Sequence, residues 1–290
     1  SDDGHCVFDP LVMRRALEYV KKFDGVIAQH AQEPRLTQGS QMNEGIVSSQ
    51  LGLKGWPAIA EEAIIARDVL LADHVQARLH ICHLTTAGGV EIIRWAKARG
   101  ISVTAEVTPH HLLLTDELAR SYDPVFKVNP PLRTEADVMA LREALADGTI
   151  DIVATDHAPH TIDEKEKPYP DCPSGLPLIQ HSLLILLDFY LEGQLTLETI
   201  VDKTSHSLAR IYGIKDRGFI REDYWADLVL IDLDKTTTVT KDNLLYECAW
   251  SPFEGKTFNS MINKTFINGE TVYDNGKLLS QPSGKRIEFL

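Results

Sequence analysis

The segment DIVATDHAPH, residues 151–160, joins a short apolar strand to three ionisable side chains. Its first four residues are typical of a buried strand. Asp156, His157 and His160 follow at the point where such a strand reaches solvent. A polar loop would give the same pattern, so the rest of the chain has to distinguish a loop from a functional site.

The same pattern recurs along the first two thirds of the chain, where short strands alternate with amphipathic helices. Helices are predicted at 9–23, 57–74, 85–100, 135–148 and 176–193, and strands at 25–30, 77–83, 101–111 and 151–154. A short strand with its loop is predicted at 125–133. This alternation predicts an α/β fold with parallel strands and right-handed crossovers. Polar residues collect after the strands, where a (β/α)8 barrel builds its active site.

A different pattern begins near residue 215. Residues 218–234, 236–240 and 264–279 are predicted to be strands and tight turns, with two Asn-Gly pairs as hairpin signals. We therefore expect two domains, a barrel part at 1–214 and a small β domain at 215–290.

Composition narrows the class of protein. The chain has 290 residues, of which 43% are hydrophobic and 24% charged, and its net charge is −13. An acidic chain argues against nucleic acid or an anionic membrane as partner. No apolar run approaches the ~20 residues of a membrane span, and no signal peptide is evident. Four scattered cysteines without CxxC spacing predict reduced thiols in a cytoplasmic protein.

His30, His83 and Asp156 share one property, because each follows a different predicted strand of one parallel sheet. A single histidine at a strand end is more often structural than a ligand, and Asp156 alone could cap a helix. Two imidazoles and a carboxylate at equivalent strand ends form a ligand set that suits Zn²⁺. Together the three residues favour a metal site.

Six motifs carry a family resemblance: SDDG, IAQHAQEPR, HICHLTT, EVTPHHLLLT, VNPPLR and DIVATDHAPH. In this order they resemble the amidohydrolase superfamily, and within it the bacterial dihydroorotases in which an aspartate bridges two metals. The segment FINGETVYDNGKLL is similar to the closing strands of the β-sandwich beside amidohydrolase barrels. The resemblance implies a (β/α)8 barrel that hydrolyses dihydroorotate reversibly to N-carbamoyl-L-aspartate, with one or two zinc ions, in pyrimidine synthesis.

The resemblance also assigns residues. It implies four metal ligands: Asp3, His30, His83 and Asp156. Asp2 is the alternative to Asp3 as the bridging carboxylate, and Asp156 would also move the proton. It implies four residues that contact the substrate: Asn129, His160, Gly175 and Leu176.

Other polar residues near these motifs have weaker assignments. His157 is expected to be structural. His110 and His111, near the entrance of the site, are expected either to contact the metal ligands without binding the metal or to be structural. The segment 161–175, rich in charge, proline and glycine, is expected to be exposed and mobile and to line the substrate entrance.

The chain departs from the family at one point, because it contains no His-x-His motif and no arginine following it. SDDG belongs at the end of the fourth barrel strand. We therefore expect the chain to represent strands 5–8 and the C-terminal sandwich strands, and to be neither active nor stable without the other half.

Three further expectations accompany the resemblance. A hydantoinase or allantoinase is the alternative enzyme, although Asn129 and His160 in their motifs favour dihydroorotase. A non-catalytic scaffold is the alternative class, although such a protein would be expected to lose its metal ligands. The family also implies a homodimer, or association with an aspartate carbamoyltransferase, as partner.

Overall fold

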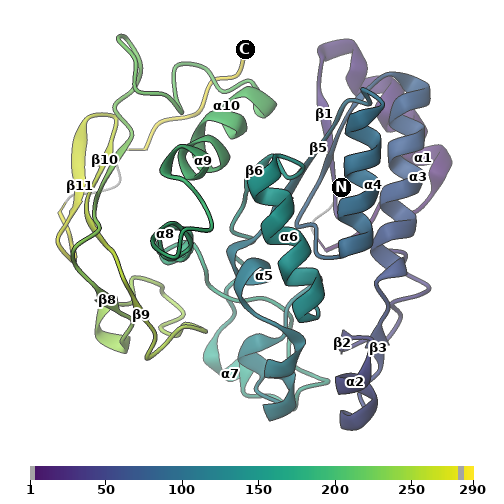
Figure 1. The fold of residues 1–290 in the computed structure, drawn as a ribbon, viewed down its shortest axis with the longest axis horizontal. Helices are drawn as coiled ribbons and strands as arrows, with labels where there is room; N and C mark the ends of the chain where they lie inside the picture. Colours follow the sequence, from purple (N-terminus) through teal and green to yellow (C-terminus); the bar gives the residue numbers. More distant parts are fainter. Residues whose placement is uncertain (1–3, 280–283) are drawn as a thin grey trace. The chain divides into compact units, whose positions relative to one another are not determined.

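The computed structural model describes residues 4–279 and 284–290 (Figure 1). Its contacts divide the chain into a first unit, Ser1–Leu178, and a second unit, Ile179–Leu290. Among the described residues, no helix combines the length and apolar character needed to cross a membrane. The four cysteines, all in the described part, are free thiols.

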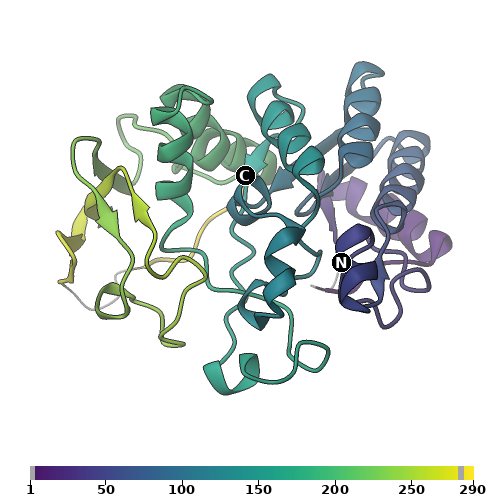
Figure 2. The same cartoon turned by 60° about the horizontal axis from the view of Figure 1, so that its bottom comes forward.

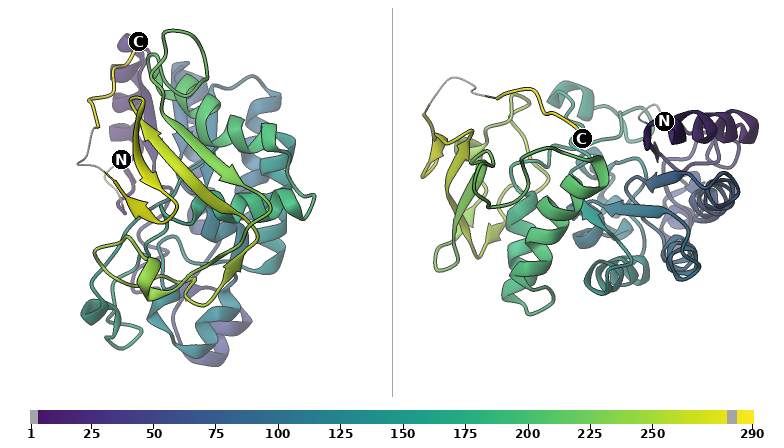
Figure 3. Two further views of the ribbon diagram at one scale, coloured as in Figure 1. Left: turned by 90° about the vertical axis from the view of Figure 1, so that its left-hand side faces the viewer. Right: turned by 90° about the horizontal axis from the view of Figure 1, so that it is seen from above.

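The first unit is built on a parallel sheet in the order β1-β4-β5-β6. Its strands are β1 (Val26–Gln29), β4 (Arg78–Ile81), β5 (Val103–Val107) and β6 (Ile152–Val153). The main helices are α1 (Pro10–Val20), α3 (Ile59–Val75), α4 (Ala87–Ala98) and α6 (Glu135–Asp147). Each helix packs on the next, so they form one layer beside the sheet, as the right-hand view of Figure 3 shows. The predicted alternation of parallel strands and helices is confirmed.

The two faces of the sheet differ in polarity. Side chains alternate along a strand, so Leu79 of β4 and Ala105 of β5 lie on one face, where both are buried. The other face carries His80, whose Nδ1 lies 2.8 Å from Thr104 Oγ1 and whose Nε2 lies 3.0 Å from Glu106 Oε2. The aliphatic core therefore forms on the helix side, and ionisable groups occupy the opposite face.

Helix starts follow the capping residues in the sequence. Asp9 caps α1 by accepting from the amides of Leu11 and Val12 at 2.8 and 3.0 Å. Thr86 caps α4 through Gly89, and Thr134 forms a capping box with Asp137 at the start of α6. These side chains satisfy amides that have no partner inside the helix.

Two predicted strands of the first unit are wrong in part or whole. The strand predicted at 101–111 ends at Val107, because Thr108 caps a short helix, α5 (Pro109–Leu113). The segment 125–133 contains no strand. It begins with the 3-10 turn η3 (Pro124–Phe126), and Pro130 and Pro131 have no amide hydrogen for a sheet.

Several short elements complete the first unit. They are η1 (Lys21–Phe23), α2 (Ile46–Leu51), η2 (Asp116–Ser121), α7 (Ile162–Lys165) and the parallel pair β2 (Met42–Asn43) and β3 (Gly55–Trp56). η1 lies at the end of the helix predicted at 9–23, and the others were not predicted, because each is too short for a periodic pattern to be recognised.

The second unit combines helices with antiparallel strands (Figure 3, left). Its helical elements are α8 (Ser182–Leu191), α9 (Leu197–Val201), the π-turn η4 (Asp202–His206), α10 (Ser207–Tyr212) and the 3-10 turn η5 (Lys241–Asn243). Its strands are β7 (Leu228–Asp232), β8 (Thr237–Thr238), β9 (Thr257–Phe258), β10 (Met261–Ile267), β11 (Glu270–Asp274) and β12 (Lys277–Leu278). Asn268 and Asn275 have positive φ at the turns of the β10-β11-β12 meander. The predicted hairpins are confirmed.

The contacts place α8 with the strands that follow it. The amide of Asn259 donates to Asp188 Oδ1 of α8 at 2.8 Å, and the amide of Gln180 donates to the Tyr246 hydroxyl at 2.8 Å. The division into units therefore falls after Leu178. The boundary after residue 214, with a β-sandwich at 215–290, stays a prediction.

Candidate active site

The carboxyl ends of β1 and β4 bring His30 and His83 together. Gln29 lies opposite Ile81 in the parallel pairing, and the amide of Cys82 donates to the Gln29 carbonyl at 3.0 Å. His30 Nδ1 then lies 2.9 Å from His83 Nε2, with ring centroids 4.6 Å apart. The side chains are 2% and 4% exposed. The two predicted histidine ligands are thus in direct contact in a buried position.

Asp156 emerges at the same edge of the sheet. β6 pairs in parallel with β5, and the amide of Ala154 donates to the Val107 carbonyl at 3.1 Å, two residues before Asp156. In the described part of the chain, no group of three or more histidine, cysteine, aspartate or glutamate side chains is arranged to hold a metal ion. The convergence of Asp156 on the histidine pair stays a prediction, and Asp2 and Asp3 lie outside the described residues.

Two candidate residues have left-handed backbone conformations. φ is +32° at His83 and +44° at Asp156. Few residues other than glycine adopt this region, although aspartate and histidine are enriched there. Such conformations cost free energy and concentrate at functional sites, so they support a functional interpretation of both strand ends.

The donor atoms of the histidine pair fit a transition-metal ion. Two nitrogen ligands of one tetrahedral zinc ion at ~2.1 Å lie roughly 3.3 Å apart, and the two facing nitrogens here are 2.9 Å apart. If the two imidazole rings moved slightly apart, a metal ion could lie between the two nitrogens. Imidazole nitrogen suits zinc and its neighbours in the first transition row.

Three predicted substrate residues lie side by side. His157 and Leu176 form a parallel bridge, and the amide of Ala158 donates to the Leu176 carbonyl at 3.2 Å. His160 Nε2 donates to the Ser174 carbonyl at 3.0 Å, just before Gly175. The structure therefore brings His160, Gly175 and Leu176 together, and we call the surface that these three residues form the wall.

Gly175 and His157 both help to fix the backbone conformation of this wall. Gly175 has φ of +131°, and a Cβ there would lie 2.5 Å from the carbonyl oxygen of Ala158. Only glycine permits this approach. His157 Nδ1 accepts from the amide of Leu178 at 3.0 Å, which agrees with its predicted structural role, and burial lowers its pKa.

The segment 161–175 is mostly exposed, as expected, and its mobility stays a prediction. Figure 2, turned to bring this side forward, shows it with α7 as an extended loop. However, Lys165, Tyr169 and Cys172 are buried within it. The segment is therefore anchored by its own side chains rather than free.

Asn129 is buried with an unsatisfied amide oxygen. Its Oδ1 has no hydrogen-bond partner in the described structure, and an unpaired buried acceptor is costly. Two residues earlier, the carbonyl of Lys127 accepts from the amide of Gly175 at 2.9 Å. Asn129 is thus tied to the wall formed by Gly175 and offers an acceptor to a ligand.

The adjacent histidines of α5 have different roles. His111 Nε2 donates to the Pro130 carbonyl at 3.1 Å, and its Nδ1 lies 2.8 Å from the Thr108 hydroxyl. His110 is fully buried, and neither ring nitrogen has a hydrogen-bond partner among the described residues. Burial lowers the pKa of His110 to about 3, with a further contribution from the charge of His83. His111 therefore holds the segment of Asn129, and His110 is a neutral imidazole near His83.

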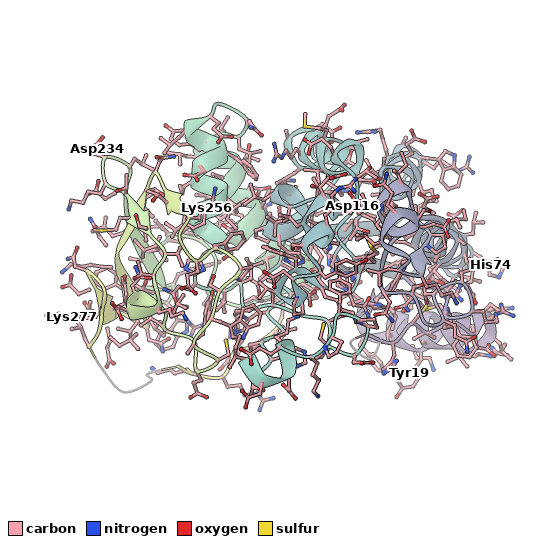
Figure 4. All side chains as sticks on the ribbon, turned by 90° about the horizontal axis from the view of Figure 1, so that it is seen from below. Tyr19, His74, Asp116, Asp234, Lys256 and Lys277 are labelled. Carbon is pink, nitrogen blue, oxygen red and sulfur yellow. The ribbon has the colours of Figure 1, made fainter. Side chains whose placement is uncertain are left out.

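Sequence reasoning missed Arg133, which is 1% exposed. Its Nε donates to Thr85 Oγ1 at 3.1 Å, and its Nη1 donates to Asn43 Oδ1 at 3.0 Å and to the Trp56 carbonyl at 2.8 Å. Asn43 in turn donates to Asp116, which Figure 4 labels, at 2.8 Å. The available signal was a pair of cations, Lys127 and Arg133, among the apolar residues of segment 125–133.

Comparison with protein families gives one match to this chain. The model of the amidohydrolase family matches residues 8–272. Among curated proteins, the dihydroorotase of Streptomyces coelicolor is 55% identical over 280 residues, which are 96% of this chain and 65% of that protein. The dihydroorotases of Leifsonia xyli and Mycobacterium tuberculosis are 52% and 48% identical, over 99% and 96% of this chain. The chain spans about 65% of the length of these relatives.

Solved structures agree on the fold. An L-hydantoinase from Arthrobacter aurescens superposes with a TM-score of 0.85 at 26% identity, covering 94% of this chain and 62% of that one. A D-hydantoinase from a Thermus species gives 0.80 at 22% identity, with coverage of 94% and 62%. With the family match, these likenesses confirm the predicted α/β fold of the TIM-barrel type.

Proposed function

The chain belongs to the amidohydrolase family, whose members are generally metal-dependent, and on that premise we propose that it serves as a dihydroorotase. The reaction is the reversible hydrolysis of the cyclic amide of dihydroorotate to N-carbamoyl-L-aspartate, in pyrimidine synthesis. The observation that carries the proposal is 55% identity to the Streptomyces coelicolor dihydroorotase over 96% of this chain. Because the chain spans 65% of that relative, the proposal applies to these residues as part of a complete barrel.

The strand-end residues supply the reacting groups. His30, His83, Asp156 and Asp3 would hold one or two zinc ions. When bound, zinc would lower the pKa of a water molecule toward neutrality and polarise the amide carbonyl. Asp156 takes the proton from the attacking water and gives it to the leaving ring nitrogen, the role of a general acid–base.

The remaining residues hold the ring. The unpaired Oδ1 of Asn129 accepts a hydrogen bond from a ring N–H. His160 would donate to the substrate carboxylate in exchange for its bond to the Ser174 carbonyl, and the backbone at Gly175 and Leu176 forms the wall against which the ring lies. The contact of His160 with the Ser174 carbonyl supports its place beside this wall.

A substrate panel tests the proposal. The assay uses this chain and a chimera that adds the part of the Streptomyces coelicolor dihydroorotase that this chain does not cover. We expect the zinc-loaded chimera to convert dihydroorotate and N-carbamoyl-aspartate into each other. Turnover of hydantoin or allantoin instead would favour the alternative enzyme, which the hydantoinase folds at 22–26% identity support less strongly. A folded chimera with neither bound metal nor turnover would favour the scaffold.

Replacing His160 with alanine in the chimera should raise KM about 10- to 100-fold, because a hydrogen bond to a charged group contributes about 1.5–3 kcal/mol. We expect kcat to change less than about threefold, since the contact is equal in the ground and transition states. Steady-state kinetics with dihydroorotate measure both values. His74→Ala, at an exposed position labelled in Figure 4, is the matched control. A fall in kcat at constant KM would contradict this role.

The partners and location stay proposals. A homodimer and an association with an aspartate carbamoyltransferase rest on the family resemblance alone. The free thiols are consistent with the cytoplasmic location proposed here.

A further inference from the structure

Two lysine side chains are buried beside the wall that Gly175 and Leu176 form. Lys165 has no exposed surface and Lys127 is 6% exposed, whereas lysine is almost never fully buried without partners. Burial lowers the pKa of both ammonium groups, that of Lys165 to about 8. Such positions need compensating acceptors.

Backbone carbonyls of the segment 161–175 supply most of these acceptors. Lys165 Nζ donates to the carbonyls of Pro173 and Gly175 at 3.0 Å each and of Lys127 at 3.3 Å. Lys127 Nζ lies within hydrogen-bonding distance of four acceptors: the carbonyls of Tyr169, Pro170 and Cys172 at 2.7, 3.2 and 2.9 Å, and Gln41 Oε1 at 2.7 Å. We call the two ammonium groups and their carbonyls the lysine cage.

The cage also joins two separate segments. The carbonyl of Lys127 accepts from the amide of Gly175 at 2.9 Å as well as from Lys165 Nζ. Asn129 lies two residues after Lys127, and Gly175 ends the caged segment. The acceptor on Asn129 and the wall at Gly175 are therefore held by one set of hydrogen bonds.

An ammonium group suits this task for a physical reason. It offers three donors and no acceptor, so one side chain can satisfy several carbonyls of a segment that lacks regular structure. Without the ammonium groups, these carbonyls would lose a donor, and each buried carbonyl left unpaired would carry a desolvation penalty. The carbonyls of Lys127 and Tyr169 would keep one other donor each. The segment would then exchange its single conformation for several.

We propose that Lys127 and Lys165 are positioning residues that hold segment 161–175 against the segment of Asn129 and so preform the wall of the substrate site. This rests on the proposed function for the identity of the substrate. The geometry of the cage itself is independent of the reaction.

Lys165→Met tests the cage, because methionine keeps the length of the side chain and removes the donors. We expect KM for dihydroorotate in the chimera to rise about tenfold or more, with kcat changed less than about threefold. Amide hydrogen exchange of residues 161–175 should become at least about tenfold faster, while exchange in α3 and α4 and the Tm change little. Lys165→Gln, which retains donors, should give intermediate values and replaces Lys165→Met if the latter does not fold.

Lys167→Met is the matched control, since Lys167 lies on the same segment and is exposed, and it should behave as the parent. Unchanged exchange and KM in Lys165→Met would overturn the proposal. Equal loss of kcat and kcat/KM together with a lower Tm would also overturn it, because the role would then be structural. If the parent chimera does not turn over dihydroorotate, the proposed function fails, and hydrogen exchange in the chain still decides whether the cage holds the segment.

Discussion

Replacing Asp156 with asparagine should lower kcat of the chimera by about 10²–10⁴, the range typical of losing a general acid–base. Asparagine keeps the shape of the side chain and tolerates the left-handed φ of +44° at this position. The backbone should therefore hold, and KM should move less than kcat. Steady-state kinetics with dihydroorotate at saturating zinc measure the effect.

The metal content has to be measured alongside the rate, because Asp156 is also a proposed ligand. Elemental analysis of wild type and variant separates a missing proton carrier from an emptied site. Asp234→Asn, at an exposed position labelled in Figure 4, is the matched control and should leave kcat unchanged. A variant with full metal and near wild-type kcat would show that Asp156 does not carry the proton.

Replacing Arg133 with methionine should lower the free energy of unfolding by about 3–5 kcal/mol, the cost of breaking a buried ion pair from one side. Arg133 Nη2 lies 3.9 Å from Glu61 Oε2, and both side chains are buried. Glu61 also accepts from the amides of Thr85 and Thr86 at 2.8 and 3.2 Å. Methionine would leave the Glu61 carboxylate buried without its cation.

Thermal unfolding measures this loss. Arg133 lies in the first unit, Ser1–Leu178. For a domain of 150–250 residues about 1 kcal/mol shifts Tm by roughly 2–4 °C, so a fall of roughly 6–20 °C is expected for this unit. Arg94→Met is the matched control, because Arg94 pairs with Asp147 at 2.7 Å on the surface, where the side chains are 46% and 38% exposed. Exposed pairs contribute about 1 kcal/mol or less. Equal shifts in the two variants would refute the buried network as the source of stability.

The elements that could be predicted from the sequence are those specified by nearby residues. Asp9 before Pro10 predicts the start of α1, and the Asn-Gly pairs predict the hairpins of β10 to β12, because caps and turns depend on a few adjacent side chains. The alternation of strands and helices then implies that strand ends meet, so His30 and His83 could be paired before any coordinates were known.

The predictions that failed lie where a local pattern competes with another local rule or with distant contacts. Thr108 follows an apolar strand, yet its hydroxyl caps α5, so the strand ends at Val107, four residues before His111. The segment 161–175 is mostly exposed, as its composition predicts, but composition did not indicate that Lys165 within it is buried. The composition of a segment indicates its overall polarity, but it does not indicate which carbonyls will surround a given side chain after folding.

Composition, periodicity and capping residues therefore specified the α/β alternation, the hairpins and the strand ends that carry His30, His83 and Asp156. Tertiary structure alone decided which charged residues are buried and what they bind. Arg133 meets Asn43 across 90 residues of sequence, and Lys127 meets Gln41 across 86. A helix cap or a turn depends on neighbours within a few residues, whereas the cost of burying a cation depends on acceptors that only folding brings to it.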